Sequence, residues 1–149
     1  MDASIFIEEE FDYAHFIPGH NKCYSLHGHT AKIKVYLRGN KGSFDMVKDF
    51  GEIKKLVKSI LSKYDHKLIV SSKYVKEIKD NIVFIQYDNF KIYLPEKDTL
   101  ILNSEITTEN LAENLCNDII SLVDDNIKSV RVVIYEGARK GAIFKKNKE

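Results

Sequence analysis

Apolar and polar residues alternate over residues 27 to 38, which is the pattern of a strand with one buried face. The row expected to face the core is Ala31, Ile33, Val35 and Leu37. Residues 4 to 16 predict a strand before it, and the glycine-containing residues 39 to 42 predict a turn after it. The two strands together predict a sheet that is buried on one side only.

Two later segments carry apolar residues at helical spacing. The first helix is expected to begin at Asp49, because Asp49 and Glu52 have the spacing of a capping box. Its expected apolar face is Phe50, Ile53, Val57, Ile60, Leu61 and Tyr64. The second helix is expected to begin at Thr107 or Thr108 and to turn inward Leu111, Leu115, Ile119, Leu122 and Val123.

Two further strand pairs complete the predicted order. Residues 82 to 87 and 90 to 94 predict a hairpin that turns at Asp88-Asn89, and residues 129 to 136 and 142 to 145 predict a final pair. Two strands, two helices separated by an inserted hairpin, and two strands predict an α+β sandwich. The 149 residues suit a single domain, 1–149, that is long enough to bury a proper core.

Composition excludes several classes of partner. Lysine and arginine total 23 against 22 aspartates and glutamates, and the lysines are spread along the chain, so no nucleic-acid-binding stripe is expected. No apolar run approaches the roughly 20 residues needed to span a bilayer, and the start of the chain lacks the basic region of a signal peptide. Two cysteines make no disulfide framework. We therefore expect a cytoplasmic protein that binds neither membranes nor nucleic acid.

His27 and His29 stand two residues apart, so both side chains project from the face that continues into the apolar row. Imidazoles at the end of a core-facing row need partners, and a divalent metal would satisfy both. A third ligand could come from His15, near the end of the neighbouring strand, and three histidines with an open position are typical of catalytic zinc. The alternative is an incidental histidine pair at the polar end of an ordinary strand. His20, after Pro18-Gly19, is expected to be solvated.

Cys23 lies in a polar stretch close to these histidines and is open to three interpretations. It could close a structural metal site as a fourth ligand, or it could act as a thiolate base or nucleophile. It could also be a small buried apolar residue, although its polar surroundings argue against that. Cys116 falls beside the apolar stripe of the second helix, which favours an inert packing role.

Six segments, taken in order, resemble the 6-pyruvoyl-tetrahydropterin synthase and 6-carboxy-tetrahydropterin synthase family. They are AHF, KCYSLHGH, MVKDFGEIKKLV, YDHKL, TTENLAENL and IYEG, and the resemblance runs from about Phe11 to Gly137. The cysteine precedes HGH by three residues, which resembles the 6-carboxy-tetrahydropterin branch. Asp45 stands where many members have glycine, and the hairpin around Asp88-Asn89 has no counterpart in the shortest members.

The resemblance implies the tunnelling fold, in which an antiparallel four-stranded sheet carries two helices on one face and closes with other subunits into a barrel. It implies a homohexamer of two stacked trimers with active sites across subunit boundaries, and a Zn²⁺ cofactor. Matched position by position, His15, His27 and His29 are the implied zinc ligands, and Cys23 is the implied catalytic cysteine.

Five further residues acquire implied roles from the same resemblance. Asp65 and His66 match the catalytic aspartate–histidine pair, although a polar helix terminus would also explain them. Glu136 ends an apolar row, where it would anchor the two adjacent donors of a pterin ring and could join the catalytic proton relay, unless it simply turns outward at the strand end. Thr107 and Thr108 match pterin-pocket threonines and would also serve as helix caps.

The implied reaction converts 7,8-dihydroneopterin triphosphate into 6-carboxy-5,6,7,8-tetrahydropterin, acetaldehyde and triphosphate, on the route to queuosine or archaeosine. Two alternatives stay open. The nearer one is a 6-pyruvoyl-tetrahydropterin synthase, which eliminates triphosphate without releasing acetaldehyde. The other is a non-catalytic, zinc-stabilised pterin-binding module in which Cys23 completes the metal shell.

Overall fold

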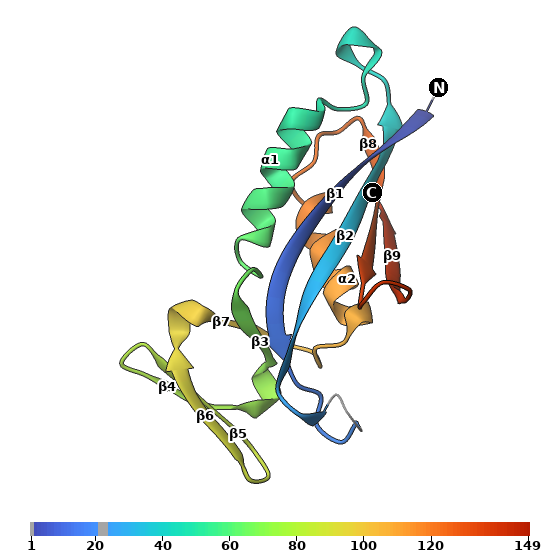
Figure 1. Cartoon of the computed structure of the whole chain (residues 1–149). Coiled ribbons are helices and arrows are strands. Elements are labelled where there is room, and N and C mark those ends of the chain that lie inside the picture. Colours follow the sequence, from blue (N-terminus) through green and yellow to red (C-terminus); the bar gives the residue numbers. More distant parts are fainter. Residues whose placement is uncertain (1, 21–23) are drawn as a thin grey trace.

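A computed structural model of the chain describes residues 2–20 and 24–149. Two helices cover one face of a six-stranded mixed sheet, and a separate three-stranded sheet lies at the end of the large sheet where β1 ends and β2 begins (Figure 1). The larger sheet has the order β7-β3-β1-β2-β8-β9. Its strands are β1 (Asp2–His15), β2 (His27–Asn40), β3 (Lys67–Ser71), β7 (Thr99–Leu102), β8 (Ile127–Tyr135) and β9 (Gly141–Asn147). The helices are α1 (Phe50–Leu61) and α2 (Thr108–Ile120), and neither is long and apolar enough to cross a membrane.

The first two strands form the centre of the sheet. They pair in antiparallel register from Asp2↔Asn40 to His15↔His27. The predicted inward row of β2 is confirmed, because all four of its residues are almost completely buried. They pack with the odd-numbered residues of β1 and with the inner faces of both helices in one apolar core. Alternation therefore places residues 15, 27 and 29 on the helix-covered face.

Both helices begin where the sequence predicts. The Asp49 carboxylate accepts a hydrogen bond from the Glu52 backbone N–H at 3.0 Å and caps α1. The predictions that Phe50 and Leu122 belong to the buried apolar faces are wrong, because Phe50 is 54% exposed and Leu122 is 59% exposed. Phe50 is the first residue of α1 and Leu122 lies beyond the end of α2, so neither is held against the sheet by helical turns on both sides.

The prediction of a four-stranded antiparallel sheet is wrong, because β3 and β7 add two parallel strands. β3 pairs with β1 through Tyr13↔Lys67 and with β7 through Leu68↔Thr99, both in parallel. Leu68, Ile69 and Val70 are consecutive and all buried. A strand that is buried on both faces reads as a continuous apolar run, so the alternation that identified β1 and β2 is missing here.

The inserted hairpin is confirmed as β5 (Ile82–Tyr87) and β6 (Phe90–Pro95), and β4 (Val75–Lys79) joins it as a third strand. Single-turn 3₁₀ helices occupy Ser43–Asp45, Ser72–Tyr74 and Glu96–Asp98. The insertion has a second apolar core of its own, formed by Phe16, Leu68, Val70, Tyr74, Val83, Ile85 and Tyr87. This core joins the insertion to β3 and to the end of β1.

Candidate active site

The three predicted histidine ligands converge at the end of the β1–β2 ladder. The Nε2 atom of His15 lies 3.1 Å from the Nε2 atom of His27 and 3.1 Å from that of His29. His15 is buried, whereas the other two rings are partly exposed. The structure thus brings together, through the pairing of His15 with His27, three side chains that the sequence could only place on two separate strands.

Backbone carbonyls determine which nitrogen of two rings faces the cluster. Nδ1 of His15 lies 2.7 Å from the Ile106 carbonyl oxygen, and Nδ1 of His27 lies 2.6 Å from the Ser25 carbonyl oxygen. A carbonyl can only accept, so each Nδ1 must carry the proton and donate it. Burial lowers the pKa of His15 to about 4, which keeps that ring neutral at pH 7 with an unprotonated Nε2.

Glu136 borders the histidine cluster from the end of β8. One carboxylate oxygen lies 3.7 Å from Nε2 of His29, and the other accepts a 2.6 Å hydrogen bond from the Thr108 hydroxyl. That hydrogen bond is the main cause that lowers the pKa of Glu136, so the group is ionised near neutral pH. Glu136 therefore turns toward the histidines rather than out into solvent.

The two threonines at the start of α2 have different roles. Thr107 is the N-cap, and its hydroxyl accepts from the Asn110 backbone N–H at 3.1 Å. Thr108 is buried and directs its hydroxyl to Glu136 instead. The prediction that both could cap the helix therefore holds only for Thr107.

Asp65 and His66 lie in a different cluster. Nδ1 of His66 is 3.0 Å from the Asp65 carboxylate, which also accepts from the Asp12 backbone N–H at 2.9 Å. That backbone hydrogen bond is the main cause that lowers the pKa of Asp65. The Thr30 hydroxyl donates to the Asp12 carboxylate at 2.5 Å, so Asp12 and Thr30 complete the cluster.

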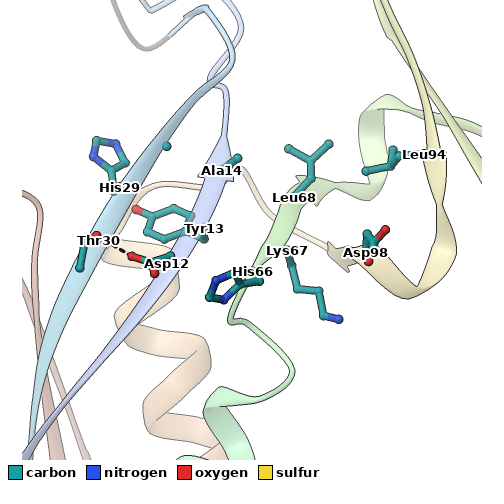
Figure 2. Close-up of a pocket in the computed structure, with 11 residues that line it drawn as sticks. Asp12, Tyr13, Ala14, His29, Thr30, His66, Lys67, Leu68, Leu94 and Asp98 are labelled. Carbon is teal, nitrogen blue, oxygen red and sulfur yellow. Dashed lines mark hydrogen bonds between the residues drawn. The ribbon is translucent and has the colours of Figure 1, made fainter.

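This second cluster opens into a cleft of about 560 Å³ on the face of the sheet away from the helices. Residues 28–30 of β2 border the cleft, but Figure 2 shows the His29 ring on the other side of β2 from His66. Asp12 is three residues from His15 and of opposite parity, so the two clusters are separated by about 10 Å of strand as well as by the sheet. The described residues of one chain do not bring His66 to the three histidines.

Comparison with known proteins decides the family. Residues 4–147 match the model of the family described as 6-pyruvoyl tetrahydropterin synthase. The chain belongs to this family.

Relatives and solved structures of the 6-pyruvoyl tetrahydropterin synthase family agree with that match. The 6-carboxy-5,6,7,8-tetrahydropterin synthase of Rickettsia typhi is 36% identical over 132 residues, which cover 85% of this chain and 88% of that protein. A Methanocaldococcus jannaschii protein provisionally given the same name is 35% identical over 145 residues, with 91% and 89% covered. The structure of Plasmodium falciparum 6-pyruvoyl tetrahydropterin synthase superposes with a TM-score of 0.84 at 28% identity over 98% of each chain.

Membership in this family of pterin synthases does not by itself place the implied cysteine. Cys23 lies outside the described residues. The other cysteine, Cys116, is fully buried in the core, its thiol contacts the Val130 carbonyl oxygen at 3.3 Å, and burial raises its pKa. Cys116 is therefore an inert packing residue, as its position on α2 predicts.

Sequence reasoning missed several members of these clusters. Asp12 and Thr30 are exposed residues on the polar face of the sheet, where a carboxylate and a hydroxyl carry no special signal. The Ile106 and Ser25 contributions come from main-chain carbonyls, which no residue type identifies. The cross-strand pair Asp12↔Thr30 follows only once the register of β1 and β2 is known.

Proposed function

We propose that the chain is a zinc-dependent lyase that converts 7,8-dihydroneopterin triphosphate and one molecule of water into 6-carboxy-5,6,7,8-tetrahydropterin, acetaldehyde and triphosphate. The observation that carries the proposal is the convergence of His15, His27 and His29 beside Glu136, in a member of a pterin synthase family. The 6-carboxy product is favoured because the relatives from Rickettsia typhi and Methanocaldococcus jannaschii carry that name. This product would feed the synthesis of queuosine or archaeosine.

The chemistry of the three histidines fits a zinc ion. Two imidazole nitrogens that both point lone pairs at each other across 3.1 Å repel one another unless a cation lies between them. Ligands on a tetrahedral zinc, with Zn–N bonds of about 2.0–2.1 Å, lie about 3.3 Å apart, close to the separations found here. The carbonyl hydrogen bonds to Nδ1 orient the rings as metal-ligating histidines require. A zinc ion bound there would supply Lewis-acid stabilisation of negative charge on substrate oxygens.

Glu136 is suited to hold the pterin ring. An ionised carboxylate can accept from two adjacent N–H donors, and such charge-assisted pairs are stronger than neutral hydrogen bonds. The Thr108 hydroxyl donates to one carboxylate oxygen and so orients the group. Glu136 would therefore fix the ring orientation and place the substrate side chain toward the histidines.

Proton transfer falls to Cys23, Asp65 and His66 in the proposed reaction. Cys23, as a thiolate, would remove a proton from the side-chain carbon next to the ring, and His66 would relay protons while Asp65 orients its imidazole. Because the Asp65–His66 pair faces the opposite side of the sheet from the histidine cluster, we place this pair at the active site of a neighbouring subunit. Active sites shared across subunits need an oligomer, and the proposed assembly is a hexamer of two trimers.

Product analysis tests the proposal directly. The purified protein is incubated with 7,8-dihydroneopterin triphosphate, and the products are identified by mass spectrometry. Acetaldehyde together with a carboxypterin supports the lyase, whereas a pyruvoyl product identifies a 6-pyruvoyl-tetrahydropterin synthase. Pterin binding without turnover would overturn the enzyme assignment in favour of a zinc-stabilised binding module.

A further inference from the structure

The inserted three-stranded sheet contacts the segment that connects β1 to β2. Phe16, the residue directly after His15, packs its ring against Tyr87 and Phe90 of the β5–β6 hairpin, with centroid distances of 4.6 and 5.2 Å. Tyr87 is 8% exposed and belongs to the apolar core of the insertion. The hairpin tip is therefore a packed platform beside one end of this connection.

The same hairpin tip holds the other end of the connection at Tyr24. The Tyr87 hydroxyl donates to the Tyr24 carbonyl oxygen at 2.7 Å, and the Tyr24 hydroxyl donates to the Asp88 carboxylate at 3.0 Å. The two tyrosine rings also pack edge to face at 5.3 Å. Tyr24 is thus fixed at its main chain and at the end of its side chain, both by adjacent residues of the hairpin.

This attachment leads directly to one of the histidines. The Tyr24 carbonyl held by Tyr87 belongs to the Tyr24–Ser25 peptide, and the next peptide, Ser25–Leu26, carries the Ser25 carbonyl, which accepts the 2.6 Å hydrogen bond from Nδ1 of His27. A carbonyl can direct an imidazole only if its own peptide plane is held, and partners of metal-ligating histidines affect metal affinity strongly for this reason. Fixing Tyr24 restricts the adjacent Ser25–Leu26 peptide through one residue of main chain, so hydrogen bonds and covalent bonds together connect Tyr87 and Asp88 to His27.

We propose that Tyr87 and Asp88 are positioning residues for His27: through Tyr24 they hold the Ser25 carbonyl that orients this imidazole toward the metal. The inference rests on the metal site of the proposed function and assigns a role in that site to the insertion. The hairpin acts at a distance, because neither Tyr87 nor Asp88 contacts His27 in the hydrogen bonds described.

Cobalt binding tests this role without measuring catalysis. Metal-free full-length protein, wild type or variant, is titrated with Co²⁺ against a competing chelator, and the visible absorption of the bound ion reports the ligand geometry. Tyr87→Phe keeps the packed ring and removes only the hydroxyl, and Tyr24→Phe removes only the hydroxyl that reaches Asp88. We expect each variant to bind Co²⁺ about 3- to 10-fold more weakly and with an altered spectrum.

Tyr93→Phe is the matched control. Tyr93 lies on the same hairpin, is 67% exposed, and its hydroxyl makes no hydrogen bond to the described part of the chain. Its variant should bind Co²⁺ as the wild type does. If Tyr87→Phe and Tyr24→Phe only lower the melting temperature and leave Co²⁺ affinity and spectrum unchanged, the positioning role is wrong although the metal site stands. A wild type that binds no Co²⁺ overturns the metal site, and the positioning role with it.

Discussion

At the scale of single residues, hydrogen bonds to main-chain carbonyls determine which atoms the histidines present. Both His15 and His27 give their Nδ1 proton to a carbonyl, so Nε2 is the atom available to a metal. Burial further disfavours protonation of His15 and His29 and lowers the pKa of both. The cluster is thus organised for a cation before any cation is bound.

Removing one of these rings should remove the metal. His27→Ala and His29→Ala are each expected to lower zinc affinity by more than about 100-fold, because partners of ligands alone typically contribute 10- to 100-fold. Zinc content after dialysis, measured by atomic spectrometry, checks this. His20→Ala changes an exposed histidine and should keep its zinc. Full metal retention in both ligand variants would contradict the ligand assignment.

The cysteine separates the enzyme from the binding module. If Cys23 is the base, Cys23→Ala should keep its zinc, its fold and its pterin affinity while turnover falls by a factor of about 10²–10⁴. Glu136→Ala is the companion variant, and it should lose pterin affinity and keep zinc. Pterin titration and zinc analysis of both proteins decide the matter. A zinc-free or unfolded Cys23→Ala protein would instead make Cys23 a structural ligand.

Asp65 should make stability depend on pH in the acid range. Its pKa lies below the ordinary 3.8 because the Asp12 N–H and then His66 stabilise the carboxylate. A carboxylate whose pKa is lowered by folding stabilises the folded protein at pH values above its ordinary pKa. It loses that contribution as the pH falls through its pKa in the folded protein.

We therefore expect Asp65→Asn to be less stable than wild type at about pH 6 and to approach it at about pH 3. Urea unfolding at both pH values measures the difference. Asp80→Asn alters an exposed turn carboxylate and serves as the control for the change of amide for carboxylate. A difference between Asp65→Asn and wild type that does not change with pH would remove the inferred role of the Asp12 N–H.

At the scale of elements, the first residues of α2 have two tasks: they cap the helix and they orient the carboxylate of Glu136. Thr107 completes the helix by accepting from Asn110, whereas Thr108 donates across to β8. Adjacent residues of one type thus serve the fold and the site separately.

The two threonines should give opposite phenotypes. Thr107→Ala removes an N-cap and is expected to lower the free energy of unfolding by about 1 kcal/mol with little change in pterin affinity. Thr108→Val keeps the shape but removes the hydrogen bond to Glu136, so pterin affinity should fall while the cap remains. Urea unfolding and pterin titration of both variants form a reciprocal control. Similar effects of the two changes on both measurements would refute the division of roles.

At the scale of the whole molecule, the histidine cluster and the Asp65–His66 cluster lie on opposite faces of the large sheet, and this separation bears on how an active site could be assembled. His66 belongs to the face away from the helices, and Glu136 to the cluster on the covered face. The short outer strand β7 and the strand β9 also leave the large sheet with two edges, which closure with other subunits would remove.

Mixing inactive variants tests for shared active sites. If one site takes Glu136 from one subunit and His66 from a neighbour, Glu136→Ala and His66→Ala proteins should together regain about a quarter of wild-type activity after random co-assembly. Glu136→Ala mixed with His29→Ala should regain none, since those residues are in contact within one chain. Sedimentation should show a multiple of three subunits. A stable, active monomer would contradict both expectations.

These residues also show which parts of the fold and of the candidate site the sequence predicts and which parts it does not. Alternation placed His27 and His29 on the covered face because side-chain direction in a strand repeats every two residues. Whether His15 comes close to His27 and His29 depends on the register between β1 and β2, which a long connection separates. The structure supplies that register through the pair His15↔His27. β3 escaped prediction because its partners are remote in sequence and its apolar run has no alternation. Asp12 looked like an ordinary surface carboxylate for lack of any local signal.

The order of pairing in the large sheet has a consequence for the chain as it is synthesised. β1 and β2 are consecutive in the chain and can pair early in synthesis. The other partner of β2 is β8, which begins only at Ile127, and the other partner of β1 is β3, so both of these pairings form later. Contacts so remote in sequence form slowly, and until then the ribbon of β1 and β2 has two open edges. Glu8, Glu9 and Glu10 lie in the middle of that ribbon. Glu8 forms ion pairs there with Lys32 and Lys34 of β2, and these charged side chains of both signs are expected to oppose pairing between the ribbons of neighbouring nascent chains and so to limit aggregation before the sheet is complete.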